Sequence, residues 1–199
     1  KFTNHFLEQG KYFMDNTLKA MLLFISLILL STPAKSDLYD DYINSVSKFP
    51  FVAFLARGPN IPTSLTGHAF VAIGIEIDNG VRVYERIFGY YPSDDGAITM
   101  VKSVFTKVDG ALKYKLSDTT WDVEYRIYID NSQSASAIAI IDNWANNDPK
   151  YNVIGNGGKN CSSLISDIAS SLGLKTPGGA GNTRPVQYIE ALRKLNNPQ

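Results

Sequence analysis

A long predicted β-hairpin constrains the fold of this chain more than any other feature. Residues 66–77, TGHAFVAIGIEI, form a β-rich apolar run, and residues 81–91, VRVYERIFGYY, return after Asp78-Asn79-Gly80. An Asn-Gly pair between two such runs is typical of a tight type I′ turn, which joins antiparallel strands. With a two-residue turn, His68 faces Tyr91 across the hairpin. The sequence therefore predicts an antiparallel sheet built around these two strands.

Further strands and helices are predicted on both sides of the hairpin. Strand-like runs precede and follow it, and helical periodicity dominates the last third of the chain, which predicts an α+β fold of one domain. With 44% hydrophobic residues the chain can form a core, and its 19 basic and 19 acidic residues give no net charge that would attract nucleic acid. The expected strands are 51–56, 101–105, 112–116 and 123–129, and the expected helices are 37–49, 132–146, 161–172 and one that Thr183 caps.

The N-terminal segment has the pattern of a signal peptide. Lys19 precedes the apolar run AMLLFISLILL at residues 20–30, which is too short to span a bilayer comfortably. Small residues follow at Ala34 and Ser36, three positions and one position before a cut. We therefore expect residues 1–36 to be a signal peptide. The alternative is an uncleaved N-terminal anchor.

The predicted cut defines the mature chain as one catalytic domain, residues 37–199. Translation would start at Met14 or Met21, which makes residues 1–13 an upstream extension or a long n-region. We expect an exported protein, periplasmic or secreted. Its single cysteine can form no internal disulfide, so a thiol that persists outside the cytosol is either buried or used.

That cysteine, Cys161, follows a glycine-rich loop and opens a helix-like segment. Asn160 is a suitable N-cap, and the apolar residues that follow recur at helical spacing. The first turn of a helix offers free N–H groups and the positive end of the dipole, which favour a thiolate. The position is typical of a cysteine nucleophile. A small buried hydrophobe is the alternative interpretation.

The only histidine after residue 36 is His68, near the start of the first hairpin strand. A hydrogen-bonded core histidine is one interpretation. The other is a base that takes the proton of the Cys161 thiol and later returns it to the leaving group. One cysteine and one histidine cannot supply the usual zinc ligands, so we expect neither a metal nor another cofactor.

Three short motifs resemble the circularly permuted papain-like cysteine hydrolases of the NlpC type. They are TGHAFV at residues 66–71, FGYYP at residues 88–92, and Asn160-Cys161 at the start of a helix. The order of elements is similar over most of the mature chain, with the histidine strand before the cysteine helix. The resemblance implies a papain-like arrangement, with Cys161 as nucleophile and His68 as base.

A third polar residue usually orients the histidine in this family, and here Tyr91 is the candidate because it faces His68 across the hairpin. Glu85 is chemically suited, but it would pair with Gly74, on the order of 20 Å along the strand from His68. Phe88 and Tyr90 are candidates to line a substrate groove.

We therefore expect an exported cysteine hydrolase that cleaves an amide, with cell-wall peptide as the substrate and a Cys161–His68 thiolate–imidazolium pair as the catalyst. One alternative is a lipid acyltransferase or thioesterase that uses the same pair. Another is a non-catalytic binding module on this fold. We expect a monomer that binds peptide and no nucleic acid.

Overall fold

The computed structural model describes residues 47–59, 66–77, 80–94, 96–114 and 116–197. The chain divides into two units, Lys1–Ser47 and Lys48–Gln199, and every described helix and strand lies in the second. The predicted signal peptide and most of the predicted helix at 37–49 lie outside the described residues. The last two residues of that helix prediction are wrong, because Lys48 and Phe49 begin a strand.

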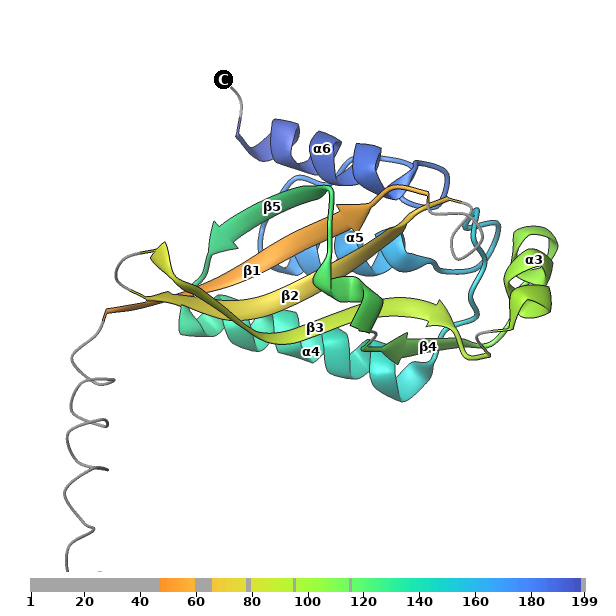
Figure 1. Cartoon of the computed structure of the whole chain (residues 1–199), viewed down its shortest axis with the longest axis horizontal. Coiled ribbons are helices and arrows are strands. Elements are labelled where there is room, and N and C mark those ends of the chain that lie inside the picture. The colour runs from red at the N-terminus through yellow and green to blue at the C-terminus, as the bar shows by residue number, and fades with distance from the viewer. Residues whose placement is uncertain (1–46, 60–65, 78–79, 95, 115, 198–199) are drawn as a thin grey trace, which may run out of the picture. The chain divides into compact units, whose positions relative to one another are not determined.

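A single five-stranded antiparallel sheet forms the centre of the second unit, in the order β4-β3-β2-β1-β5 (Figure 1). The predicted α+β class with an antiparallel sheet is therefore confirmed for the described residues. The strands are β1 (Lys48–Arg57), β2 (His68–Ile77), β3 (Arg82–Pro92), β4 (Gly110–Lys113) and β5 (Val123–Tyr128).

Both faces of the central strands are buried, which explains why their sequences are apolar without alternation. Along β1, Val52, Phe54 and Ala56 belong to the core cluster between the sheet and the helices, here called the helix-side core. Phe51 and Leu55 belong to a smaller cluster on the opposite face, here called the second core. All five side chains are fully buried.

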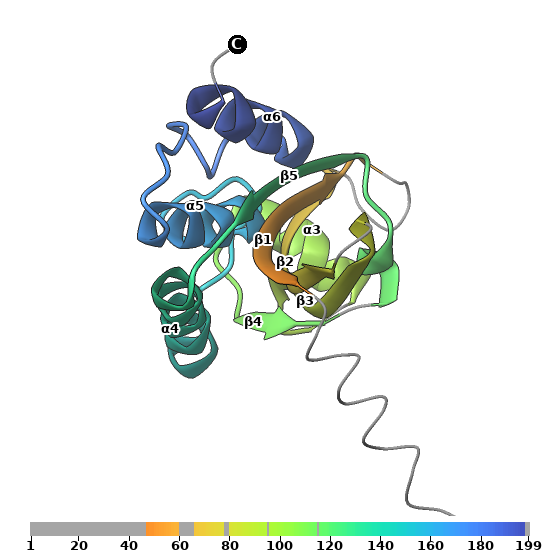
Figure 2. The same cartoon turned by 90° about the vertical axis from the view of Figure 1, so that its left-hand side faces the viewer.

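Three helices cover the helix-side core, and Figure 2 shows them stacked against one face of the sheet. They are α4 (Asn131–Asn147), α5 (Cys161–Ser171) and α6 (Pro185–Asn196). Their buried residues include Trp144, Ile165 and Ile189. The helix α3 (Ala97–Phe105) lies apart from these three, beyond the ends of β3 and β4 (Figure 1).

The register of the hairpin agrees with the prediction at the end that carries His68 and departs from it toward the turn. Phe70 pairs with Gly89, in phase with a His68–Tyr91 pair, but the register shifts by one between Ile73 and Gly74. The expected pairing of Glu85 with Gly74 is wrong, because Gly74 pairs with Tyr84. Glu85 is the extra residue of a β-bulge, which absorbs the shift.

Three further expectations are corrected. The predicted strand at 101–105 is the end of α3, because a short apolar run does not distinguish a strand from a helix. The predicted strand at 112–116 is the shorter β4, and a 3₁₀ turn, η2 (Leu116–Thr119), follows it. The N-cap of α6 is Arg184, because the Thr183 hydroxyl donates to the carbonyl oxygen of Gly179 instead.

Candidate active site

The start of α5 places Cys161 at the first helical position, as the sequence predicts. The side chain of Asn160 accepts a hydrogen bond from the Ser163 amide at 3.0 Å. The Asn160 amide in turn donates to the Ser163 hydroxyl at 3.2 Å, which completes a capping box. This reciprocal cap fixes where the helix begins and therefore where the thiol lies.

The same asparagine fastens the helix start to two loops. Its side-chain amide donates to the carbonyl oxygens of Val153 at 3.0 Å and Gly181 at 3.1 Å. Asn160 is 4% exposed, so these bonds are protected from water. Gly181 also lies so close to Gly155 that a Cβ on Gly155 would sit 2.5 Å from the Gly181 Cα. Asn160 therefore joins the start of α5 to the loop that contains Val153 and to the loop that contains Gly181.

The thiol of Cys161 is buried, with 6% of the residue exposed. Burial raises the pKa of this thiol, and hydrogen bonds from the backbones of Ala69, Ser162 and Cys161 itself oppose that rise. The helix N-terminus by itself predicts a thiolate here. The structure has the expected N–H donors, but desolvation outweighs them, and the thiol keeps its proton at neutral pH.

The thiol lies at the end of the ladder between β2 and β3, a place here called the fork. The β2–β3 ladder ends at the pair Phe70–Gly89, and Ala69 stands just beyond that pair. The backbone of Ala69 interacts with the sulfur of Cys161 at this place and opposes the rise in the pKa of the thiol. This contact brings the thiol to the residue that directly follows His68.

The imidazole of His68 lies over the other strand of the same fork. A Cβ on Gly89 would be 2.3 Å from Nε2 of His68 and 3.0 Å from the Tyr91 ring, so only a glycine leaves room for the imidazole. His68 is 5% exposed. Its ring stacks on Tyr91, with centroids 4.1 Å apart, and more distantly on Phe70, at 6.0 Å.

The two predicted catalytic groups approach the fork from different sides of the sheet. Cys161 belongs to the helix-side core, whereas His68 is in phase with Phe70, which belongs to the second core. The thiol meets β2 at Ala69, and the imidazole meets β3 at Gly89. A direct bond between thiol and imidazole stays a prediction.

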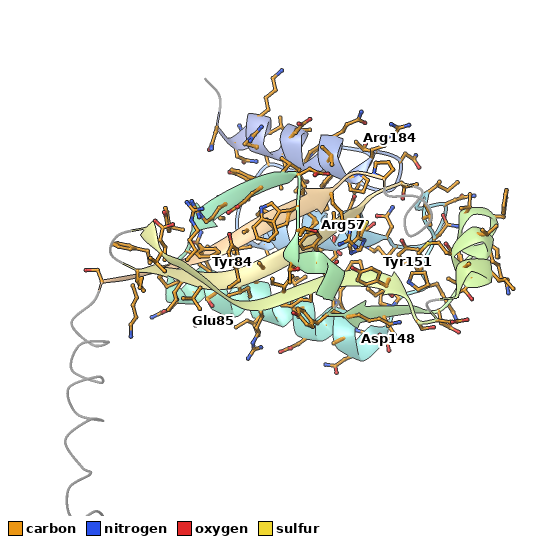
Figure 3. The ribbon with its side chains drawn as sticks, viewed as in Figure 1. Arg57, Tyr84, Glu85, Asp148, Tyr151 and Arg184 are labelled. Atoms are coloured by element: carbon orange, nitrogen blue, oxygen red, sulfur yellow. The ribbon has the colours of Figure 1, made fainter. Side chains whose placement is uncertain are left out.

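Tyr91 links His68 to a buried ion pair that the sequence does not predict. Its hydroxyl donates to the carboxylate of Asp118, 2.6 Å from either oxygen. Asp118 is fully buried and pairs with Arg57 at 3.1 Å. Figure 3 shows Arg57 toward the same end of the sheet as Tyr151. Asp118 lies in a short polar turn and Arg57 at the end of a strand, so neither stands out in the sequence.

Burial also perturbs the phenol of Tyr91. Burial first, and then the charge of Asp118, raise the pKa of Tyr91 well above its usual value, and the charge of a Cys161 thiolate acts in the same direction. The phenol therefore stays protonated and can only donate to the carboxylate.

Phe88 and Tyr90, predicted to line a substrate groove, lie in the helix-side core. Tyr90 is fully buried, donates its hydroxyl to the carbonyl oxygen of Pro149, and packs edge-on against Trp144. Phe88 is 9% exposed. In this structure both side chains contribute to packing beneath the site.

An open cleft of about 530 Å³ lies beside the start of α5. The two loops that Asn160 joins form its walls, and neither Cys161 nor His68 lines it. Its lining consists of small and polar residues and one apolar side chain: Ile154, Gly155, Asn156, Gly157, Gly181 and Asn182. Such a lining suits an extended polar chain better than a compact apolar ligand.

Neither a metal centre nor a membrane span is found in the described part of the chain. There, no three or more histidine, cysteine, aspartate or glutamate side chains gather in a way that could hold a metal ion. Within the same ranges, no helix combines the length and apolar content needed to cross a membrane.

Comparisons with protein-family models, with curated proteins and with solved structures found no match. The resemblance to permuted papain-like hydrolases therefore rests on the residues alone. Chemically, the arrangement combines a thiol near backbone N–H groups, an imidazole stacked on the Tyr91 phenol, and a cleft in the loops that Asn160 joins to the start of α5. A thiol and a base at one fork can support acyl transfer.

Proposed function

We propose that this chain is a cysteine hydrolase with a permuted papain-like arrangement, which cleaves an amide bond after export. One observation carries the proposal: the backbone of Ala69, the residue after His68, interacts with the sulfur of Cys161 at the start of α5 and opposes the rise in the pKa of the thiol. The only cysteine of the chain and the only histidine after residue 36 thus reach one fork of the sheet from positions far apart in sequence.

In the proposed reaction the sulfur attacks the carbonyl carbon of the substrate. His68 takes the thiol proton as the S–C bond forms, and the carbonyl electrons move onto oxygen. When the C–N bond breaks, the imidazolium gives its proton to the leaving amine. Water then attacks the resulting thioester, with His68 as the base, and releases a carboxylic acid and the free thiol.

The raised pKa of Cys161 defines the role of the base. Since burial keeps the thiol protonated in the resting protein, the nucleophile must lose its proton during the reaction rather than before it. A base at the fork is therefore required for every turnover. The stack of His68 on Tyr91, whose hydroxyl is fixed by Asp118, supports the ring from one side.

The proposed substrate is a peptide of the cell wall. The cleft beside α5 is lined by backbone-rich loops and two asparagines, which offer hydrogen bonds to an extended peptide. An exported amide hydrolase meets cell-wall peptide directly. A lipid acyl group transferred by the same pair is the alternative within this chemistry.

A non-catalytic binding module is the second candidate, and the burial of the thiol favours it. Cys161 is 6% exposed and His68 5%. A substrate carbonyl must displace covering atoms to reach the sulfur. A module that kept the fold would use the cleft and leave the thiol inert.

The experiment offers purified peptidoglycan and its soluble stem peptides to the full chain and measures new free amines and product masses. Cys161→Ala and His68→Ala should each abolish release. Tyr114→Phe, which removes a hydroxyl from a tyrosine that is 61% exposed, is the matched control and should not change it. A phospholipid and an acyl thioester are tested in parallel.

The outcomes separate the candidates. Amine release that depends on both residues supports the amide hydrolase, with a Cys161 acyl adduct in the intact mass as confirmation. Fatty-acid release with the same dependence points to the lipid alternative. Binding of stem peptides without turnover, unchanged in Cys161→Ala, would establish the binding module and overturn the proposal.

A further inference from the structure

The helix α3 exposes an apolar stripe on the face away from the rest of the fold. Its fully buried residue is the polar Ser103, whereas Ile98 is 84% exposed, Val101 52% and Phe105 83%. Spacings of three and four residues put these three apolar side chains on one face of the helix. A single exposed leucine or phenylalanine is ordinary, but an exposed apolar stripe on a helix is typical of an interaction surface.

The helix is held in place by hydrogen bonds of its inner face. The carbonyl oxygen of Ser103 accepts from the Val153 amide at 3.0 Å, and that of Thr106 accepts from the Asn152 side chain at 3.2 Å. At the other end the carboxylate of Asp94 accepts from the Gly96 amide and the Thr99 hydroxyl. The exposed stripe therefore contributes little to the core that positions α3.

The charges around the stripe are positive. Residues 96–107, GAITMVKSVFTK, contain Lys102 and Lys107 and no carboxylate. Lys102 is exposed, follows Val101 and flanks the stripe, whereas the exposed Lys107 lies over the loop at Gly157, where a Cβ would be 3.0 Å from its Nζ. The carboxylate of Asp94 is turned toward the helix start by its hydrogen bonds. Apolar side chains flanked by a lysine match a lipid–water interface with anionic headgroups.

We propose that α3 docks on an anionic lipid surface, with Ile98, Val101 and Phe105 inserted below the headgroups and Lys102 at headgroup level. A second copy of the chain fits less well. A nine-residue helix is about 14 Å long, and its face falls far short of the ~800 Å² per partner of a stable interface. Paired stripes would also bring the two Lys102 side chains together. The proposal does not depend on the hydrolase function.

The test places an environment-sensitive fluorophore on the helix of the full chain. In a Cys161→Ser background, Phe105→Cys is labelled with nitrobenzoxadiazole and mixed with vesicles of phosphatidylcholine and phosphatidylglycerol. Val83→Cys, at a strand residue that is 45% exposed, is the matched control. Both variants carry the apolar run at residues 20–30, so any binding through that run affects them equally.

We expect the emission at position 105 to shift to the blue with vesicles and to be quenched by nitroxide-labelled lipid. Position 83 should show neither effect. Neutral vesicles or high salt should weaken the effect, since lysine attraction to headgroups is screened. An unchanged spectrum at 105, or equal changes at 105 and 83, would overturn the proposal. A shift without vesicles that grows with protein concentration would instead establish a second copy as the occupant.

Discussion

The ring of His68 stacks on the ring of Tyr91, with centroids 4.1 Å apart and an angle of 28° between the planes. Tyr91 is held at its far end by Asp118, which accepts a hydrogen bond from the phenol. The stack therefore couples the position of the proposed base to a buried carboxylate. It also lets the roles of the ring and the hydroxyl be tested separately.

Replacing Tyr91 with Phe should keep the ring and lose the hydroxyl. Because the buried carboxylate of Asp118 loses a donor, we expect the free energy of unfolding to fall by about 1–3 kcal/mol while turnover stays near that of the parent. Tyr91→Ala should lose turnover as well, since His68 loses its support. Denaturant titration and amine release measure the two effects. Full turnover in Tyr91→Ala would show that the stack does not position the base.

The hairpin was the most predictable part of the fold. An Asn-Gly pair and two β-rich runs determine an antiparallel pair, and the predicted register is correct from Phe70–Gly89 to Ile73–Arg86. The bulge at Glu85 could not be predicted, because nothing in local sequence distinguishes one extra strand residue. The strand prediction at 101–105 was wrong because a short apolar run does not distinguish a strand from a helix, and in α3 three of the apolar residues, Ile98, Val101 and Phe105, face outward.

The site was predictable only in part. Cys161, its cap and its place in a helix follow from local rules, because an asparagine before an apolar-periodic segment predicts an N-terminus. The pKa of the thiol does not follow from local rules. The sequence indicates the helix dipole, but it does not show the burial whose effect on the pKa is larger. Asp118 and Arg57 meet only because η2 folds against the end of β1, which is a tertiary event.

Removing the charge of Asp118 should be costly. Asp118→Asn leaves the Arg57 guanidinium, whose side chain is 19% exposed, without its carboxylate. We expect the free energy of unfolding to fall by about 3–5 kcal/mol, as for other broken buried pairs. Asp109→Asn breaks an exposed pair with Lys150 and is the matched control, which should unfold at the same denaturant concentration as the parent. Similar stabilities for the two variants would mean that Asp118 is solvated in solution.

A methyl group at Gly89 should disable the proposed base. In Gly89→Ala the new Cβ would lie 2.3 Å from Nε2 of His68, so the imidazole must leave its place over the strand. We expect turnover to fall at least as far as in His68→Ala, with the far-ultraviolet circular dichroism unchanged. Gly178→Ala is the control, because nothing lies within 4 Å of a Cβ at that position. Normal turnover in Gly89→Ala would exclude the observed imidazole position as the active one.

The pKa of Cys161 predicts a pH dependence of stability. Burial raises this pKa in the folded protein, whereas the unfolded thiol titrates near its ordinary value of about 8.5. The contribution to stability is therefore complete below about pH 8.5 and is lost as the pH rises through the folded pKa. We expect the parent to lose stability between neutral and alkaline pH more steeply than Cys161→Ser.

Iodoacetamide should modify the folded protein slowly at neutral pH and rapidly after denaturation. Parallel stability profiles, or rapid modification of the folded protein at pH 6, would show a thiolate instead.

The last prediction separates the two roles of Asn160. Asn160→Ser keeps an oxygen that caps the Ser163 amide but loses the donors to Val153 and Gly181, whereas Asn160→Ala loses both functions. Because serine caps a helix about as well as asparagine, the alanine variant should be less stable than the serine variant by about 1 kcal/mol. Both variants should free the Gly181 loop, seen as faster hydrogen exchange at its amides, and both should weaken binding of stem peptides in the cleft, whose wall includes Gly181. Unchanged hydrogen exchange and unchanged peptide binding in Asn160→Ser would mean that the cap alone sets the position of Cys161. The cleft wall would then keep its structure without the hydrogen bonds from Asn160 to Val153 and Gly181.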